Sequence, residues 1–165
     1  MLERKNKIGY LIIIIIILLC FNKTKYLKND TNIFIFDNYN NTFDIYLKIP
    51  KIDFKKTFND KSSLKDNIML SPYSKIKNNK STIIILGHSG YAKNAFFNDL
   101  INLSINDEIF IKYFGVTYKY IIFDIDYITK KSSYIITYEQ NYLYLVTCDL
   151  FNLNKQIVIK AKCIK

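Results

Sequence analysis

The chain has 165 residues, the length of a single domain with room for a sizeable core. Its formal net charge is +10, almost entirely from lysine, because Arg4 is the single arginine and His88 the single histidine. This charge favours anionic neighbours such as membrane headgroups or wall polymers, although a biased genome would also enrich Lys, Asn, Ile and Tyr together. The sequence contains no Gly-rich phosphate loop, zinc-ligand cluster or recognition helix, so we predict no metal, no cofactor and no nucleic-acid partner.

An apolar run from Ile8 to Phe21 follows a short cationic segment. Its fourteen residues would form a helix of roughly 21 Å, shorter than a hydrocarbon core of about 30 Å. That length also suits a cleaved signal peptide, but no small-x-small cleavage site follows the run. We predict a cytoplasmic tail over 1–7 and an uncleaved single-pass membrane anchor over 8–21, with a cleaved signal as the alternative. Lysines on both sides leave the orientation open.

Residues 22–42 are polar and asparagine-rich and are predicted to form a stalk, which leaves 43–165 as the domain. Turn signals divide this domain into seven or eight short strands. The predicted strands are Ile45–Ile49, Ile52–Phe54, Ile68–Leu70, Thr82–Leu86, Glu108–Tyr113, Val116–Tyr127, Tyr142–Thr147 and Gln156–Lys162. The apolar run Thr82–Leu86 suits a strand buried on both faces, and Phe114-Gly115 predicts a tight hairpin. Helical spacing over 95–103 predicts one short helix, so the fold class is an all-β closed or nearly closed barrel.

Strand parity predicts where the side chains of the last two strands point. Leu143 and Leu145 are the better core candidates, so Cys148, which has the opposite parity, is expected to face out of the barrel. Gln156 is expected to face outward for the same reason. If the two strands form an antiparallel hairpin, Cys148 lies beside Gln156, while Cys163 lies roughly 23 Å along the strand. A disulfide requires Cα atoms within about 7 Å, so Cys148 is predicted to remain a thiol.

Cys148 and His88 supply the two groups that cysteine-based acyl transfer requires. A thiolate attacks a carbonyl, an imidazolium favours that thiolate and protonates the leaving amine, and a second amine releases the thioester. We assign Cys148 as the nucleophile and His88 as the general acid and later base. The structural alternatives are a buried cysteine and a hydrogen-bonded core histidine at a strand end. Parity argues against the first, and the flanking Gly87 and Ser89-Gly90 argue against the second.

Four features in chain order resemble the sortases, the exported cysteine transpeptidases of Gram-positive bacteria. Leu145-Val146-Thr147-Cys148 is similar to the Leu-x-Thr-Cys strand end of that family, and Leu86-Gly87-His88-Ser89 is similar to its Gly-His segment. The sixty-residue separation, the run Phe96-Phe97-x-x-Leu100 and the terminal strand Ile157–Ala161 agree with it. The resemblance covers Phe43 to Lys165.

The resemblance implies a closed eight-stranded sortase-like β-barrel on the extracellular side of the cell membrane, behind the anchor helix. It also implies cleavage of a C-terminal sorting motif in secreted proteins through a thioester on Cys148. The acyl group would then pass to an amine, such as that of a peptidoglycan precursor or a pilin lysine.

One position departs from the family pattern. Sortases carry an arginine near the start of the last strand, where it holds the substrate and steadies the oxyanion, but this chain has Gln156 there with Lys155 beside it. A glutamine amide donates neutral hydrogen bonds, whereas lysine offers a point charge. We assign Gln156 to the arginine role, hold Lys155 as the substitute, and expect Ser89, Val146, Thr147 and Lys155 to contact substrate.

Two other readings remain open. A membrane-anchored binding domain that has kept the barrel but lost turnover would account for the missing arginine. An unrelated cysteine peptidase or amidase fits less well, because the common orders place the cysteine before the histidine.

Overall fold

The computed structural model describes residues 42–164 apart from 77–80, 132, 139 and 153. The predicted cytoplasmic tail, membrane anchor and nearly all of the stalk, over 1–41, lie outside the described residues. Within the described residues, no helix has both the length and the apolar character needed to cross a bilayer.

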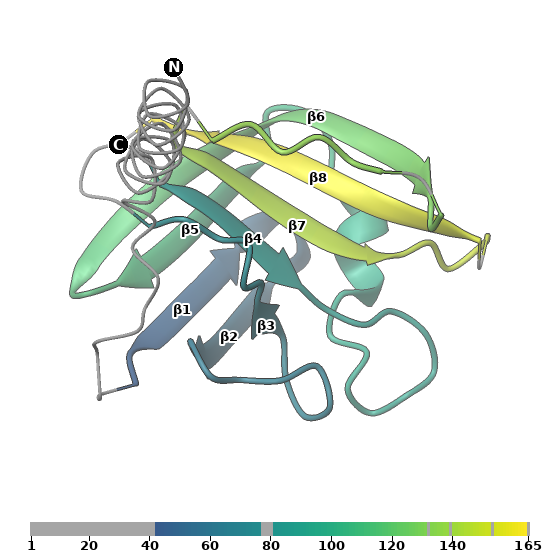
Figure 1. Ribbon diagram of the computed structural model, residues 1–165, viewed down its shortest axis with the longest axis horizontal. Coiled ribbons are helices and arrows are strands. Elements are labelled where there is room, and N and C mark those ends of the chain that lie inside the picture. Colours follow the sequence, from purple (N-terminus) through teal and green to yellow (C-terminus); the bar gives the residue numbers. More distant parts are fainter. Residues whose placement is uncertain (1–41, 77–80, 132, 139, 153, 165) are drawn as a thin grey trace, which may run out of the picture. The chain divides into compact units, whose positions relative to one another are not determined.

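Eight strands form one curled sheet with the order β2-β1-β5-β6-β8-β7-β4-β3 (Figure 1). The elements are β1 (Asp44–Ile49), η1 (Pro50–Ile52), β2 (Phe54–Asn59), β3 (Met69–Leu70), β4 (Thr82–Leu86), η2 (Asn98–Asn102), β5 (Glu108–Tyr113), β6 (Val116–Thr129), β7 (Tyr142–Cys148) and β8 (Lys155–Cys163). The end strands β2 and β3 come into contact without forming a ladder. The predicted all-β, eight-stranded barrel is therefore confirmed, although it is nearly closed and not fully closed.

The interior is filled by alternate residues of the strands, as the period of two requires. In β7, Leu143 and Leu145 are fully buried in the core, and β8 contributes Ile157, Ile159 and Ala161 to the same core. The predicted inward faces of both strands are confirmed. Ile84 of β4 is buried in a second cluster on the outer side of the sheet, so the prediction that β4 is buried on both faces is also confirmed.

The hairpin predicted at Phe114-Gly115 is present between β5 and β6. Both turn residues are left-handed, with φ of 48° and 77°, which is the geometry of a type I′ turn and the reason for glycine at the second position. Strand β6 continues two residues beyond its predicted end, to Thr129.

Two predicted elements are wrong in detail. The strand predicted at Ile52–Phe54 is instead the 3-10 turn η1, because Pro50 fixes a helical φ at its first position and Asp53 ends it in a left-handed conformation. Strand β2 starts only at Phe54. The helix predicted over 95–103 is a 3-10 helix limited to Asn98–Asn102, which still buries Leu100 in the core.

Candidate active site

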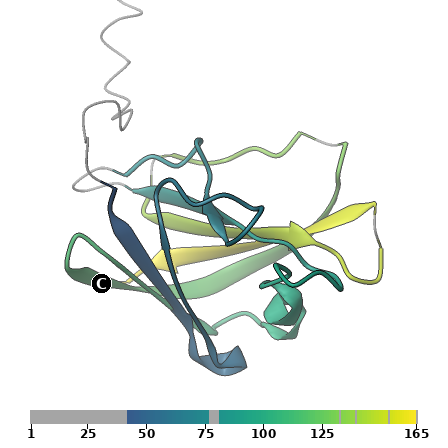
Figure 2. The same cartoon turned by 90° about the horizontal axis from the view of Figure 1, so that it is seen from below.

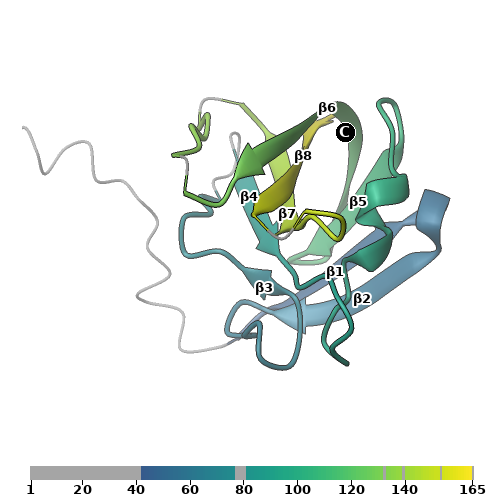
Figure 3. The ribbon, with the colours of Figure 1, turned by 90° about the vertical axis from the view of Figure 1, so that its right-hand side faces the viewer.

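Strand register brings the predicted catalytic residues to one end of the barrel. β4 and β7 form the parallel pair in the described sheet, with Leu86 opposite Val146. His88 and Cys148 each lie two positions beyond that pair. They therefore lie at the same height along the barrel, where β4 and β7 end. In the antiparallel β7–β8 ladder, Cys148 is directly opposite Gln156. Figure 3, which faces this end, shows β4, β7 and β8 side by side.

Cys148 has the accessibility that a reactive thiol requires. It shares the outer face of β7 with Tyr144 and Val146, as parity predicted, and its side chain is half-buried. His88 is also half-buried. Cys148 and Cys163 are both thiols, and Cys163 lies opposite Tyr120 near the far end of β8. The prediction that no disulfide joins these two cysteines is therefore confirmed.

The segment Gly87–Gly90, here called the His88 loop, is hydrogen-bonded to β7 on one side and to the start of η2 on the other. Toward β7, the Gly87 N–H donates to the Val146 carbonyl over 3.1 Å, and the Ser89 hydroxyl donates to the Cys148 carbonyl. Toward η2, the Phe97 N–H donates to the His88 carbonyl over 2.9 Å. The helix η2 lies at the end of the barrel where β7 ends and β8 begins (Figures 1 and 2).

Gly87 is required by close packing against Phe97. A Cβ at this position would lie 2.4 Å from the Phe97 Cδ2 atom. We expect Gly87→Ala to lower the free energy of unfolding by about 1–3 kcal/mol, the usual cost of overpacking a core, as measured by urea denaturation. Adding Phe97→Leu should recover part of that loss, because the smaller side chain vacates the space of the ring. An unchanged free energy of unfolding for Gly87→Ala would contradict this account.

Gln156 and Lys155 differ in the face that they occupy. Gln156 shares its parity with Val158 of the outer cluster, so it lies on the same face as Cys148 and is half-buried. Lys155 shares its parity with Ile157, which points inward, and its own side chain is exposed at the beginning of the strand. Of the two, only Gln156 lies on the face of Cys148.

The residues expected to contact substrate occupy different environments. Val146 is half-buried on the outer face two residues before Cys148. Thr147 is 3% exposed and points into the barrel, where its hydroxyl has no hydrogen-bond partner among the described residues. A substrate on the outer face would meet the Thr147 backbone and not its side chain. The Ser89 hydroxyl is engaged with the Cys148 carbonyl.

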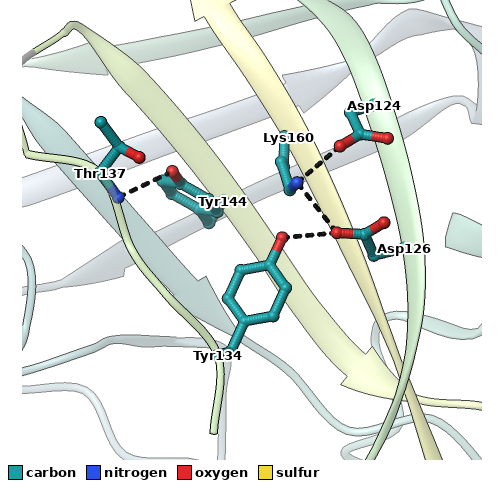
Figure 4. Close-up of polar contacts among 6 residues, drawn as sticks. All are labelled: Asp124, Asp126, Tyr134, Thr137, Tyr144 and Lys160. Carbon is teal, nitrogen blue, oxygen red and sulfur yellow. Dashed lines mark hydrogen bonds and ion pairs between the residues drawn. The ribbon is translucent and has the colours of Figure 1, made fainter.

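Residues 133–138, here called the outer strap, lie over the outer face of β7 and β8 (Figure 4). Tyr134 and Ile136 pack against Ile84, Tyr144 and Val158, which are at most 3% exposed. Cys148, at the end of β7, is half-buried. The strap was not predicted from the sequence, although half-buried and exposed positions alternate along it as in a strand.

A polar network holds the strap in place. The Tyr134 hydroxyl donates to Asp126 over 2.8 Å, the Lys160 ammonium pairs with Asp124 and Asp126, and the Thr137 N–H donates to the Tyr144 hydroxyl over 3.3 Å (Figure 4). Burial raises the pKa of Tyr134 to about 12, and the hydrogen bond from Lys160 is the main cause that lowers the pKa of Asp126. At neutral pH, Tyr134 is therefore a neutral donor to an ionised carboxylate, which is the stronger kind of hydrogen bond.

A sequence profile of the sortase domain matches residues 47–164. The chain belongs to the sortase family. Sortases are cysteine transpeptidases, and the matched range spans His88, Cys148 and Gln156. A comparison with curated proteins found no match to this chain.

Solved sortase structures share its fold. Sortase C1 of Streptococcus agalactiae is 23% identical with a TM-score of 0.65, and the match covers 73% of this chain and 66% of that chain. The Clostridium perfringens sortase D5 transpeptidase is 22% identical with a TM-score of 0.64, covering 73% and 78%. Sortase C of Clostridium perfringens, solved with the C-terminal cell wall sorting motif, is 18% identical with a TM-score of 0.63, covering 73% and 69%. The present sortase thus spans just under two thirds of the length of sortase C1.

Proposed function

We propose that this sortase cleaves a sorting motif in secreted proteins through a thioester on Cys148 and transfers the acyl group to an amine. The observation that supports this most strongly is the register that puts Cys148 opposite Gln156 and level with His88. Sortase C of Clostridium perfringens was solved with the C-terminal cell wall sorting motif, which supports a similar substrate here. The acceptor would be an amine of a peptidoglycan precursor or a pilin lysine, and the anchor over 8–21 would keep the domain at the extracellular membrane surface.

The catalytic groups that the reaction needs all lie at this end of the barrel. The Cys148 thiolate adds to the scissile carbonyl carbon, and the C–N bond breaks as His88 gives its proton to the leaving amine. The acceptor amine then adds to the thioester and loses a proton to His88, and the C–S bond breaks to regenerate the thiolate. The Gln156 amide donates a hydrogen bond to the oxyanion that forms in each step.

A binding domain without turnover is the second candidate. It is favoured by one observation, namely that the single arginine of the chain is Arg4, far outside the sortase domain. Such a domain would hold a sorting peptide on the outer face and leave its peptide bond intact.

Transfer to an added amine separates the two candidates. The full chain in detergent is incubated with a panel of sorting-type peptides, with and without a glycine or lysine peptide as acceptor, and the products are identified by mass. We expect a cleaved product that carries the acceptor. Saturable binding of a peptide without cleavage would favour the binding domain.

We expect Gln156→Ala to lower the rate of acyl transfer by about 10²- to 10³-fold, the usual effect of removing one oxyanion donor. Lys155→Ala should change the rate only a few-fold, because that side chain lies at the other parity and in solvent. The measurement is kcat with the best peptide of the panel. Equal effects of the two substitutions, or no effect of either, would remove Gln156 from the mechanism.

A further inference from the structure

We infer that Ser89 and Asn98 are positioning residues that hold the His88 imidazole in place beside the Cys148 sulfur. The inference rests on the proposed function, because it assigns these residues a part in the same reaction. It gives Ser89 a role different from the substrate contact expected from sequence, and it gives a role to Asn98, for which the sequence predicts none.

Ser89 continues the link between β4 and β7 beyond the end of their ladder. The backbone ladder closes with the Gly87 N–H on the Val146 carbonyl, and Ser89 then bonds the carbonyl of Cys148 itself, 59 positions away in the chain. The residue after the histidine is thus attached to the residue that carries the nucleophile. Because its hydroxyl donates to the Cys148 backbone carbonyl, Ser89 fixes the distance between the His88 loop and the end of β7.

Asn98 holds the other side of the His88 loop. Its Oδ1 accepts from the Gly90 N–H over 2.7 Å, and its Nδ2 donates to the Gly90 carbonyl over 3.0 Å. Gly90 has a φ of +130°, a conformation that L side chains rarely adopt, so the chain turns at this point. Asn98 begins η2, whose Leu100 is buried in the core, and this gives the amide a rigid support.

The two side chains therefore fix the two residues that follow the histidine, Ser89 toward β7 and Gly90 toward η2. Only two side-chain torsions separate that backbone from the imidazole, so a fixed backbone restricts where the ring can reach. A general acid must lie about 2.6–3.2 Å from the atom it protonates, and a misplacement of about 1 Å can cost 10²-fold in rate. The link from Ser89 to the Cys148 carbonyl extends this restriction to the strand end that carries the sulfur.

The first test measures whether substitution of Ser89 or Asn98 changes kcat or KM. We expect Ser89→Ala and Asn98→Ala to lower kcat by about 10- to 100-fold with KM within about three-fold, and Ser89→Thr, which keeps the hydroxyl, to restore most of kcat. Ser104→Ala and Asn102→Ala, at exposed positions on or just after η2, are the matched controls and should behave as wild type. A raised KM with unchanged kcat for Ser89→Ala would mean that Ser89 contacts substrate and would overturn the inference.

The second test needs no peptide substrate. The rate of Cys148 alkylation by iodoacetamide is measured in the full chain by peptide mass at pH 6.5 and pH 9.5. An imidazolium held beside the sulfur favours the thiolate at pH 6.5, whereas an ordinary thiol is already largely ionised at pH 9.5 without help. Ser89→Ala, Asn98→Ala and His88→Ala should therefore all react several-fold more slowly than wild type at pH 6.5 and about equally fast at pH 9.5.

The outcomes separate the two proposals. If His88→Ala slows alkylation at pH 6.5 but Ser89→Ala and Asn98→Ala react as wild type, the positioning role is wrong and the transpeptidase proposal stands. If the three variants are slowed together but no peptide of the panel is cleaved, the positioning role holds and the proposed reaction fails.

Discussion

Cys148→Ala is expected to abolish both peptide cleavage and transfer to an amine. The reaction proposed here passes through a thioester on the Cys148 sulfur, and alanine provides no atom that could form it. The substitution removes a half-buried side chain at the end of β7, so the free energy of unfolding should change little. The measurement is product formation over many hours with the best peptide, together with a urea denaturation curve of the same preparation.

Cys163→Ala is the control for this prediction. Cys163 is a second thiol in the same barrel, but it packs against the interior core and lies near the far end of β8. We expect this variant to retain turnover within about two-fold of wild type when the comparison is made below its unfolding transition. Turnover that persists in Cys148→Ala, or disappears only in Cys163→Ala, would place the nucleophile elsewhere.

His88→Ala is expected to lower kcat by about 10²- to 10⁴-fold, the range that proton transfer by a positioned group contributes. The loss should come from both halves of the reaction, because His88 protonates the leaving amine and later accepts the proton of the incoming one. No other histidine in the chain can take over these steps.

Adding free imidazole to the solution tests this prediction by restoring the missing group of His88→Ala. Adding it should raise the turnover of His88→Ala in proportion to its concentration and leave Cys148→Ala inactive. Turnover by His88→Ala that equals wild type would show that the imidazole has no part in the chemistry.

The sequence predicted those parts of the fold that depend on local periodicity. The inward and outward faces of β7 and β8 follow from a period of two, which the chain cannot change without exposing Leu143 or Ile159. The pairing of Cys148 with Gln156 also followed, because a short connection between adjacent strands sets their register. The hairpin at Phe114-Gly115 followed from turn chemistry.

The parts that were missed depend on contacts remote in sequence. The parallel pairing of β4 with β7 brings His88 level with Cys148, yet nothing local to either strand specifies that pairing. Asn98 gains its role only when η2 is placed against the His88 loop. The outer strap was missed because its apolar residues pack against a cluster on the outside of the sheet, where parity alone predicted solvent.

The most direct test of the central claim is the mass of the full chain after mixing with excess sorting peptide and quenching in acid without an amine acceptor. The account predicts an adduct equal to the acyl half of the peptide, carried by the tryptic fragment that contains Cys148, removed by hydroxylamine and absent from Cys148→Ala. An unmodified mass with peptides that the protein demonstrably binds, or an adduct that survives in Cys148→Ala, would contradict it.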